Sequence, residues 1–249
     1  MKQMKNNAML LLTALIWGCA FVAQSVGMDY VGPFTFNCVR CLIGSVVLIP
    51  VIVLMDRMKK KSGMSEAEIR KERGDIRTIL TGGICCGVVL AAASSLQQFG
   101  ILFTTVGKAG FITAMYIVLV PILGIFVGKK IRPLILVCVV IAVAGLYFLC
   151  MTEQLSLGKG DLFVLFCAFV FSIHILVIDH FSPLVDGVRM SAIQFLTAGL
   201  LCAVPMLVWE RPVMGEILTA WMPILYAGVM SCGVAYTLQI LGQKHADPA

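Results

Sequence analysis

Eight long apolar stretches, separated by short charged segments, restrict this chain to very few folds. They cover Asn6–Met28, Val31–Met55, Thr78–Gly107, Ala109–Gly128, Pro133–Thr152, Leu162–Ile178, Met190–Trp209 and Ile217–Gln243. Apart from Arg40, they contain no Lys, Arg, Asp or Glu. Most reach the roughly 20 residues with which a helix crosses about 30 Å of hydrocarbon. Because backbone hydrogen bonds in lipid must be satisfied internally, we predict an all-α polytopic membrane protein with eight transmembrane helices.

The composition excludes an ordinary soluble domain, since 60% of the residues are hydrophobic and 13% are charged. Soluble domains average about 45–50% apolar and about 25% charged residues. All ten cysteines fall in or at the edge of the apolar stretches, whereas a disulfide framework would place them in loops. Cys38 and Cys41 form a single CxxC inside an expected helix, where we prefer small apolar packing over metal or redox use. We expect neither a metal nor a cofactor.

The first 24 residues combine a basic start with an apolar segment, as a signal peptide does. Bulky Trp17 stands where cleavage requires a small residue, and seven further apolar stretches follow. We therefore interpret Asn6–Met28 as the first transmembrane helix.

Basic residues gather on one side of the expected topology. With a cytoplasmic N-terminus, fifteen Lys and Arg residues fall on the cytoplasmic side and three on the outer side. The outer three are Lys108, Lys159 and Arg211, and the cytoplasmic fifteen are Lys2, Lys5, Arg57, Lys59, Lys60, Lys61, Arg70, Lys71, Arg73, Arg77, Lys129, Lys130, Arg132, Arg189 and Lys244. Because cytoplasmic loops carry the excess of basic residues, we predict a multi-pass plasma-membrane protein with both ends of this chain in the cytoplasm.

The segment Asp56–Asp75 is the only long hydrophilic loop that this topology leaves, and we place it in the cytoplasm. Ser65 and Glu68 have the spacing of a capping box, which predicts a short helix over Glu66–Arg73. We interpret the basic cluster Lys59–Lys61 as a topological anchor, with binding of anionic lipid as the alternative.

The second half of the chain repeats features of the first half. A shift of 154 residues brings Trp17 onto Phe171 and Arg40 onto Gln194, and a shift of 142 brings Gln97 onto Gln239. We interpret residues 1–151 as a five-helix unit and residues 158–249 as a second copy with three helices. An odd number of helices per unit inserts the second copy upside down. The repeat also leads us to expect a fragment that lacks about 45 residues, the length of two spans with their turns.

Several segments resemble a known family. They are "LIWGCAF", "GPFTFNCVR", "TTVGKAGFITAMYIVLVPILG", "GKGDLFVLFCAFVFS" and "AYTLQILGQKHADPA", and together with their surroundings they cover essentially the whole chain. In these features the chain resembles the EamA type of the drug/metabolite transporter superfamily. The resemblance implies ten helices in two inverted five-helix repeats around a central cavity, of which this chain has eight. Its motifs are diffuse, so they indicate the fold much better than the substrate.

Arg40 is the one charge near the middle of an apolar stretch. A central arginine costs about 2.5–3.5 kcal/mol on insertion scales, and its side chain can reduce this cost by reaching outward. A structural arginine bonded to neighbouring carbonyls and an anchor for an anionic substrate group are both consistent with this position. Gln194, its partner in the repeat, keeps the hydrogen-bonding capacity without the charge.

Other polar and aromatic residues are candidates for lining a substrate cavity, with interhelical packing as the alternative for each. The full set of candidates is Trp17, Arg40, Ser94, Gln97, Gln98, Phe111, Tyr116, His174, Gln194, Tyr236 and Gln239. His174 lies deep in a span, where it is either a proton-coupling group or a neutral, hydrogen-bonded packing residue.

The leading functional hypothesis is a secondary transporter, most readily an exporter, of small organic metabolites or amphipathic compounds by alternating access. Its partners would be a small-molecule substrate and the lipid bilayer, with a proton as the candidate coupling ion and no nucleic acid. The chain contains no GxxxxGK[ST], HExxH or GxSxG motif, and we expect no enzymatic activity. The alternative is an inactive or partner-dependent fragment of such a transporter.

Overall fold

The structure is a computed structural model that describes residues 2–126, 128, 133–151 and 158–243. Every regular element in these ranges is helical, which confirms the predicted all-α class. Seven segments of the described chain are long and apolar enough to cross a membrane, namely Asn6–Gly27, Pro33–Lys61, Glu66–Ile101, Val106–Phe126, Lys159–Phe181, Gly187–Glu210 and Trp221–Gly242. They coincide with seven of the eight expected runs. The fold is that of a polytopic membrane protein.

The helices follow one another with short connections. In chain order they are α1 (Lys2–Gly27), α2 (Pro33–Lys61), α3 (Glu66–Arg73), α4 (Ile76–Ile101), α5 (Val106–Ala114), α6 (Tyr116–Phe126), α7 (Pro133–Met151), α8 (Lys159–Phe181), α9 (Gly187–Pro205), α10 (Met214–Thr219), α11 (Trp221–Leu225) and α12 (Tyr236–Gln243). Two π-helices, η1 (Met206–Glu210) and η2 (Tyr226–Ala235), extend α9 and join α11 to α12. The eighth expected run, Pro133–Thr152, contains α7, a helix of 19 residues.

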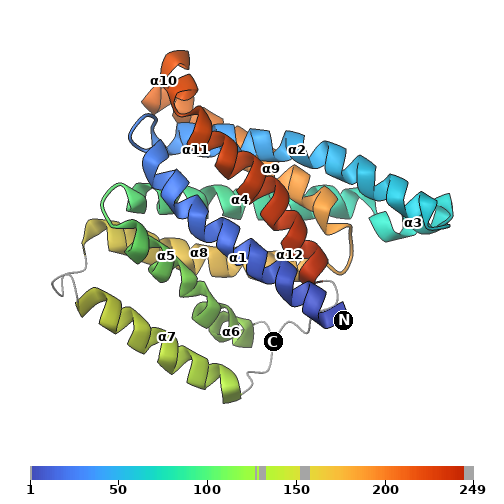
Figure 1. Ribbon diagram of the computed structural model, residues 1–249, viewed down its shortest axis with the longest axis horizontal. Coiled ribbons are helices and arrows are strands. Elements are labelled where there is room, and N and C mark those ends of the chain that lie inside the picture. Colours follow the sequence, from blue (N-terminus) through green and yellow to red (C-terminus); the bar gives the residue numbers. More distant parts are fainter. Residues whose placement is uncertain (1, 127, 129–132, 152–157, 244–249) are drawn as a thin grey trace.

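The long helices lie side by side in one bundle (Figure 1). In its centre α4 packs against α8 and α9, while α2 packs against α9 and η2. On the flanks α1 packs against α12 and η2, and α5 and α6 pack against α8. The N-terminus of α1 and helix α3 lie at one end of the bundle, which we call the α3 end (Figure 1). Helix α10 lies at the opposite end, which we call the α10 end (Figure 1).

The predicted helix Glu66–Arg73 is confirmed as α3, with its capping box. The Ser65 hydroxyl accepts a hydrogen bond from the backbone N–H of Glu68, and the Glu68 carboxylate accepts one from the backbone N–H of Ser65. Of the basic residues used to predict the topology, Lys129, Lys130, Arg132 and Lys244 lie outside the described residues. Residues 244–249 also lie outside the described residues.

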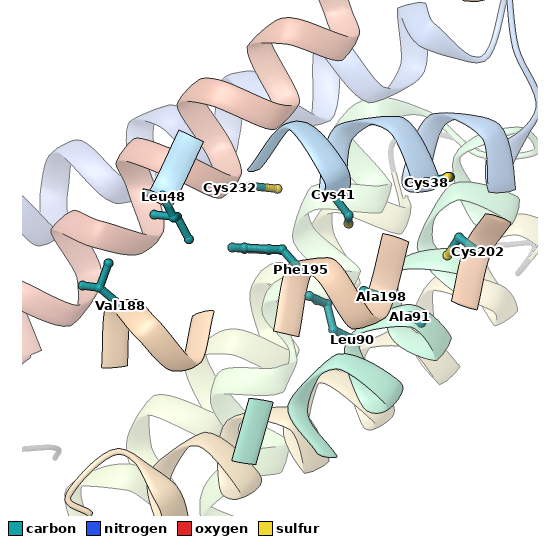
Figure 2. Packing of buried hydrophobic residues seen from close by; sticks show 10 residues of the cluster. All are labelled: Cys38, Cys41, Leu48, Leu90, Ala91, Val188, Phe195, Ala198, Cys202 and Cys232. Atoms are coloured by element: carbon teal, nitrogen blue, oxygen red, sulfur yellow. The ribbon is translucent and has the colours of Figure 1, made fainter. Parts of the chain in front are cut away.

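Four cysteines belong to the main buried cluster of the bundle, and each of them is free. Figure 2 shows Cys38 and Cys41 of α2, Cys202 of α9 and Cys232 of η2 around Phe195 and Leu90. A thiol is small and weakly polar, so it fills gaps between closely approaching helices at little cost. Small residues thus let α2, α4, α9 and η2 meet at close range.

Candidate substrate site

Arg40 lies inside the bundle, with only 7% of its surface exposed. Its Nη1 donates a hydrogen bond to Gln24 Oε1 of α1 at 3.3 Å, and its Cζ lies 5.8 Å from the centroid of the Phe36 ring. Its Nε is buried and has no hydrogen-bond partner. Within the described ranges no carboxylate forms an ion pair with Arg40. A positive charge is therefore held in the bundle by neutral groups, namely the Gln24 amide, the Phe36 ring and the Cys41 thiol.

Asn37 is fully buried on α2, three residues before Arg40. Side chains at this spacing are neighbours on one face of a helix. Neither the Oδ1 nor the Nδ2 of Asn37 has a hydrogen-bond partner. An unpaired buried amide is costly, because it has lost water and gained nothing in exchange. The Asn37 and Arg40 side chains thus offer several unused polar atoms at one place.

Aromatic rings from three helices meet around Tyr236. The Tyr236 ring of α12 lies 5.3 Å from Trp17 and 4.8 Å from Phe195, in edge-to-face geometry in both cases. Tyr236 lies within electrostatic range of Arg40 and of Tyr116 on α6. The structure therefore brings two predicted candidates, Trp17 and Tyr236, into contact, and it places Tyr236 within electrostatic range of Arg40 and of Tyr116.

His174 and Gln194 form a second buried polar pair, which joins α8 to α9. The His174 Nε2 and the Gln194 Oε1 are 3.2 Å apart, and 2% and 1% of their respective residues are exposed. The Phe171 ring packs edge-on against the imidazole at 6.1 Å. The Nε2 of Gln194 has no partner. Arg40 and Gln194 are aligned by the 154-residue shift. Each forms a hydrogen bond with a side chain of the preceding long helix, Arg40 with Gln24 of α1 and Gln194 with His174 of α8.

The polar residues of α4 divide into satisfied and unsatisfied groups. The Ser94 hydroxyl donates to the carbonyl of Leu90 at 2.7 Å, within its own helix. Gln97 donates to the Thr113 hydroxyl at 3.3 Å and so ties α4 to α5. Gln98 contacts Met28 Sδ through its Nε2 at 3.5 Å, and its Oε1 is buried without a partner. Gln98 is therefore the α4 residue with spare hydrogen-bonding capacity.

Two predicted candidates lie apart from these contacts. The half-buried ring of Phe111 faces α7, because a β-carbon added at Gly145 would lie 3.0 Å from its Cζ. Gln239 is half-buried on α12 and forms no side-chain hydrogen bond with any other described residue. Gln24 and Asn37 were missed in the sequence, although both are polar residues in apolar runs. Asn37 also has the helical i, i+3 spacing from Arg40.

A third residue missed in the sequence, Glu210, joins η1 to the start of α2 at the α10 end. Its carboxylate accepts hydrogen bonds from the backbone N–H groups of Phe34 at 2.9 Å and Thr35 at 2.7 Å, and from the Thr35 hydroxyl at 2.6 Å. The absence of a side chain at Gly32 makes room, since a β-carbon there would lie 2.3 Å from Glu210 Cδ. Glu210 thus caps α2 from another helix, and we call these contacts the Glu210 clamp.

Asp56 makes a corresponding connection at the α3 end. Its Oδ2 accepts hydrogen bonds from Arg189 of α9 and from Arg73 of α3, the latter at 2.7 Å. Beside it, the Lys59 ammonium lies 3.5 Å from Asp186, which caps the N-terminus of α9. We call the contacts of Asp56 with the two arginines the Asp56 clamp. They hold the end of α2, helix α3 and the start of α9 together.

Comparisons with known proteins agree with this architecture. A model of the EamA-like transporter family matches residues 4–151 and 158–249. An uncharacterized transporter of Archaeoglobus fulgidus is 29% identical over 203 residues, which are 81% of this chain and 58% of that protein. This chain thus spans little more than half the length of the archaeal relative. The uncharacterized transporter YoaV of Bacillus subtilis is 23% identical over 94% of this chain and 79% of its own length.

A solved structure has a similar fold, with a TM-score of 0.67 at 20% identity, over 97% of this chain and 80% of the other. The family match covers both halves of the chain, as the helical bundle does. The chain therefore belongs to the EamA-like transporter family.

Proposed function

We propose that this chain is a secondary transporter that exports small organic metabolites or amphipathic compounds by alternating access. It would have eight spans, with α7 as the fifth, in two inverted units that cover residues 1–151 and 158–249. The observation that carries the proposal is that contacts at one end of the bundle have counterparts at the other end. The residues in each contact and in its counterpart are related by the same shifts as the sequence repeat.

The two clamps are the first such pair of contacts. Glu210 binds Thr35 at the α10 end, and Asp56 binds Arg189 at the α3 end. A shift of 154 residues relates Asp56 to Glu210 and Thr35 to Arg189, since 210 − 56 and 189 − 35 are both 154. A two-fold axis in the membrane plane would exchange the two ends in this way, which is the symmetry of an inverted repeat.

Two glycine contacts give the second pair. A β-carbon added at Gly100 on α4 would lie 2.4 Å from Val164 Cγ2 of α8, and one at Gly242 on α12 would lie 3.0 Å from Leu10 Cδ2 of α1. The glycines differ by 142 positions, and Leu10 and Val164 differ by 154. These are the two shifts of the sequence repeat. Both glycines allow close helix approach in corresponding places of the two halves.

The basic residues support an orientation with the α3 end in the cytoplasm of a plasma-membrane protein. Lys59, in the last turn of α2, and Asp186 of the α8–α9 turn form an ion pair, so these two segments lie on one side of the bundle. The side chains of Arg40, Asn37, Gln98 and Gln194 would contact substrate between the two halves. His174 is the candidate for coupling to protons, because it is a buried imidazole next to this region.

Export from reconstituted vesicles tests this proposal. The purified chain would be placed in liposomes loaded with a panel of radiolabelled aromatic and aliphatic acids, amines and amides, with a pH gradient of either sign. We expect gradient-dependent release of at least one class, and none from liposomes that contain a heat-inactivated sample. Equal release from both preparations would reject transport by this chain.

Labelling of single cysteines in a cysteine-free background tests the orientation. Cysteines introduced at Lys60 and at Arg189 should react from the cytoplasmic side, and one at Gly215 of α10 from the outer side. Reaction of the first two from opposite sides would reject the topology.

A further inference from the structure

We propose that Arg40 and Asn37 form a binding site for the carboxylate of an organic acid whose remaining part is apolar. This inference rests on the proposed transport function and names the substrate class for it. It follows from an uncompensated charge, from the position of the unused donors and from the groups around them.

The charge of Arg40 determines the sign of the ligand. Arg40 is 93% buried, since 7% of it is exposed, and no described carboxylate pairs with it. A buried charge without a counter-ion is costly in proteins, and a hydrogen bond to a neutral group removes only part of that cost. An anionic ligand would remove this cost on binding. A neutral or cationic ligand would leave it in place.

The shape of the free donors favours a carboxylate. Gln24 occupies Nη1 of the guanidinium, whereas Nε is unpartnered. A carboxylate binds a guanidinium with two parallel N–H···O bonds, and Nε takes part in the side-on form of this pair. Asn37, one helical turn away, has a free Nδ2 that can donate to one of the same oxygens. Two unpartnered donors on one face of α2, Arg40 Nε and Asn37 Nδ2, can thus converge on one planar anion.

The surroundings of the guanidinium favour an apolar remainder of the ligand. Arg40 lies within electrostatic range of Cys167, Cys202, Cys232 and Tyr236, from four other elements. These four groups are three thiols and one aromatic ring, and the Cys41 thiol contacts the guanidinium as well. A hydrated, multiply charged acid would lose its water there without replacement. A monocarboxylate with an alkyl or aryl body suits this environment best.

Thermal stability in detergent measures binding to the purified 249-residue chain. The probes are 3-phenylpropionate and its uncharged match 3-phenylpropionamide, with hexanoate and hexanamide as a second pair, all at one pH and one ionic strength. We expect a saturable rise in Tm with at least one carboxylate and a dissociation constant at least ten-fold weaker for its amide. Equal effects of acid and amide in both pairs, or no effect of either acid, would overturn the proposal.

The variants Arg40→Gln and Asn37→Leu identify the site. Loss of a charge-assisted hydrogen-bond pair weakens carboxylate binding by about 10- to 100-fold in Arg40→Gln, and loss of one donor by about 5- to 10-fold in Asn37→Leu. Arg77→Gln and Asn7→Leu make the same chemical changes at exposed positions and should leave binding unchanged.

The ligand-free stability of the variants separates a binding arginine from a structural one. Removing an uncompensated charge or an unpaired amide should leave Tm equal to or above that of the parent chain. An Arg40→Gln chain that unfolds or loses more than a few degrees would show that Arg40 supports the fold, and would reject the site.

The vesicle assay distinguishes failure of this inference from failure of the transport function. Release of amides as fast as carboxylates would reject the site and leave transport intact. Tight carboxylate binding without release of any compound would keep the site and reject transport.

Discussion

The Glu210 clamp gives the sharpest prediction about how the bundle is held together. Replacing Glu210 by Ala removes the acceptor for three hydrogen bonds, two of them from Thr35, which is fully buried. Loss of a helix N-cap costs about 0.5–2 kcal/mol, and an unsatisfied buried hydroxyl costs about 1–3 kcal/mol. Water reaches the half-buried end of η1 and recovers part of this. We therefore expect a loss of about 2–3 kcal/mol.

For a chain of this size, 1 kcal/mol corresponds to about 2–4 °C, so Tm should fall by about 5–10 °C. Tryptophan fluorescence during heating in detergent measures the transition. Glu216→Ala is the matched control, because Glu216 caps exposed α10 through a single 3.3 Å bond to the Val213 N–H. Its removal should cost less than about 0.5 kcal/mol. If Glu210→Ala lowered Tm no more than Glu216→Ala, the clamp would make no measurable contribution to the stability of the bundle.

Four further predictions follow from other contacts. Gly32→Ala should lower Tm nearly as much as Glu210→Ala, and the double variant should add little, because both changes remove the same contact; additive losses in the same heating assay would contradict this. Asp56→Asn should cost roughly 1–2 kcal/mol of stability, because it breaks the ion pairs with Arg73 and Arg189. In 1 M salt the difference in Tm between the variant and the parent chain should become smaller. A difference in Tm that salt leaves unchanged would contradict ion pairing. Gly100→Ala should cost about 1–3 kcal/mol through overlap with Val164, whereas Gly107→Ala, which meets nothing within 4 Å, should be neutral; equal melting of the two variants would refute the close approach of α4 and α8. His174→Gln should abolish the pH-gradient dependence of vesicle release while keeping the contact with Gln194, and an unchanged dependence would exclude His174 as the coupling group.

The positions of seven of the eight expected spans followed directly from the sequence, because helix length and the absence of charge largely decide which segments enter lipid. Arg40 was recognisable as a candidate for the same reason, because a charged side chain inside a span is costly and therefore rare. The capping box of α3 was equally local, since Ser65 and Glu68 are only three residues apart. Features that depend on one segment at a time were therefore predictable.

Features that depend on the neighbours of a helix were not predictable in this way. Glu210 contacts Thr35 across 175 positions of the chain, and nothing near either residue indicates the other. The packing of the Phe111 ring against Gly145 likewise depends on α7, which covers that face of α5. In the spans almost every residue is apolar, so periodicity indicates poorly which face of a helix looks inward.

The π-helix η2 has a consequence for the aromatic contacts at its end. Ten residues there use the wider i→i+5 pairing, which places more residues in each turn than an α-helix does. A return to α-helical pairing would lengthen this segment and rotate everything after it about the helix axis. Tyr236 is the first residue after η2, so its ring would turn away from Trp17 and Phe195. The winding of η2 thus sets which rings Tyr236 contacts.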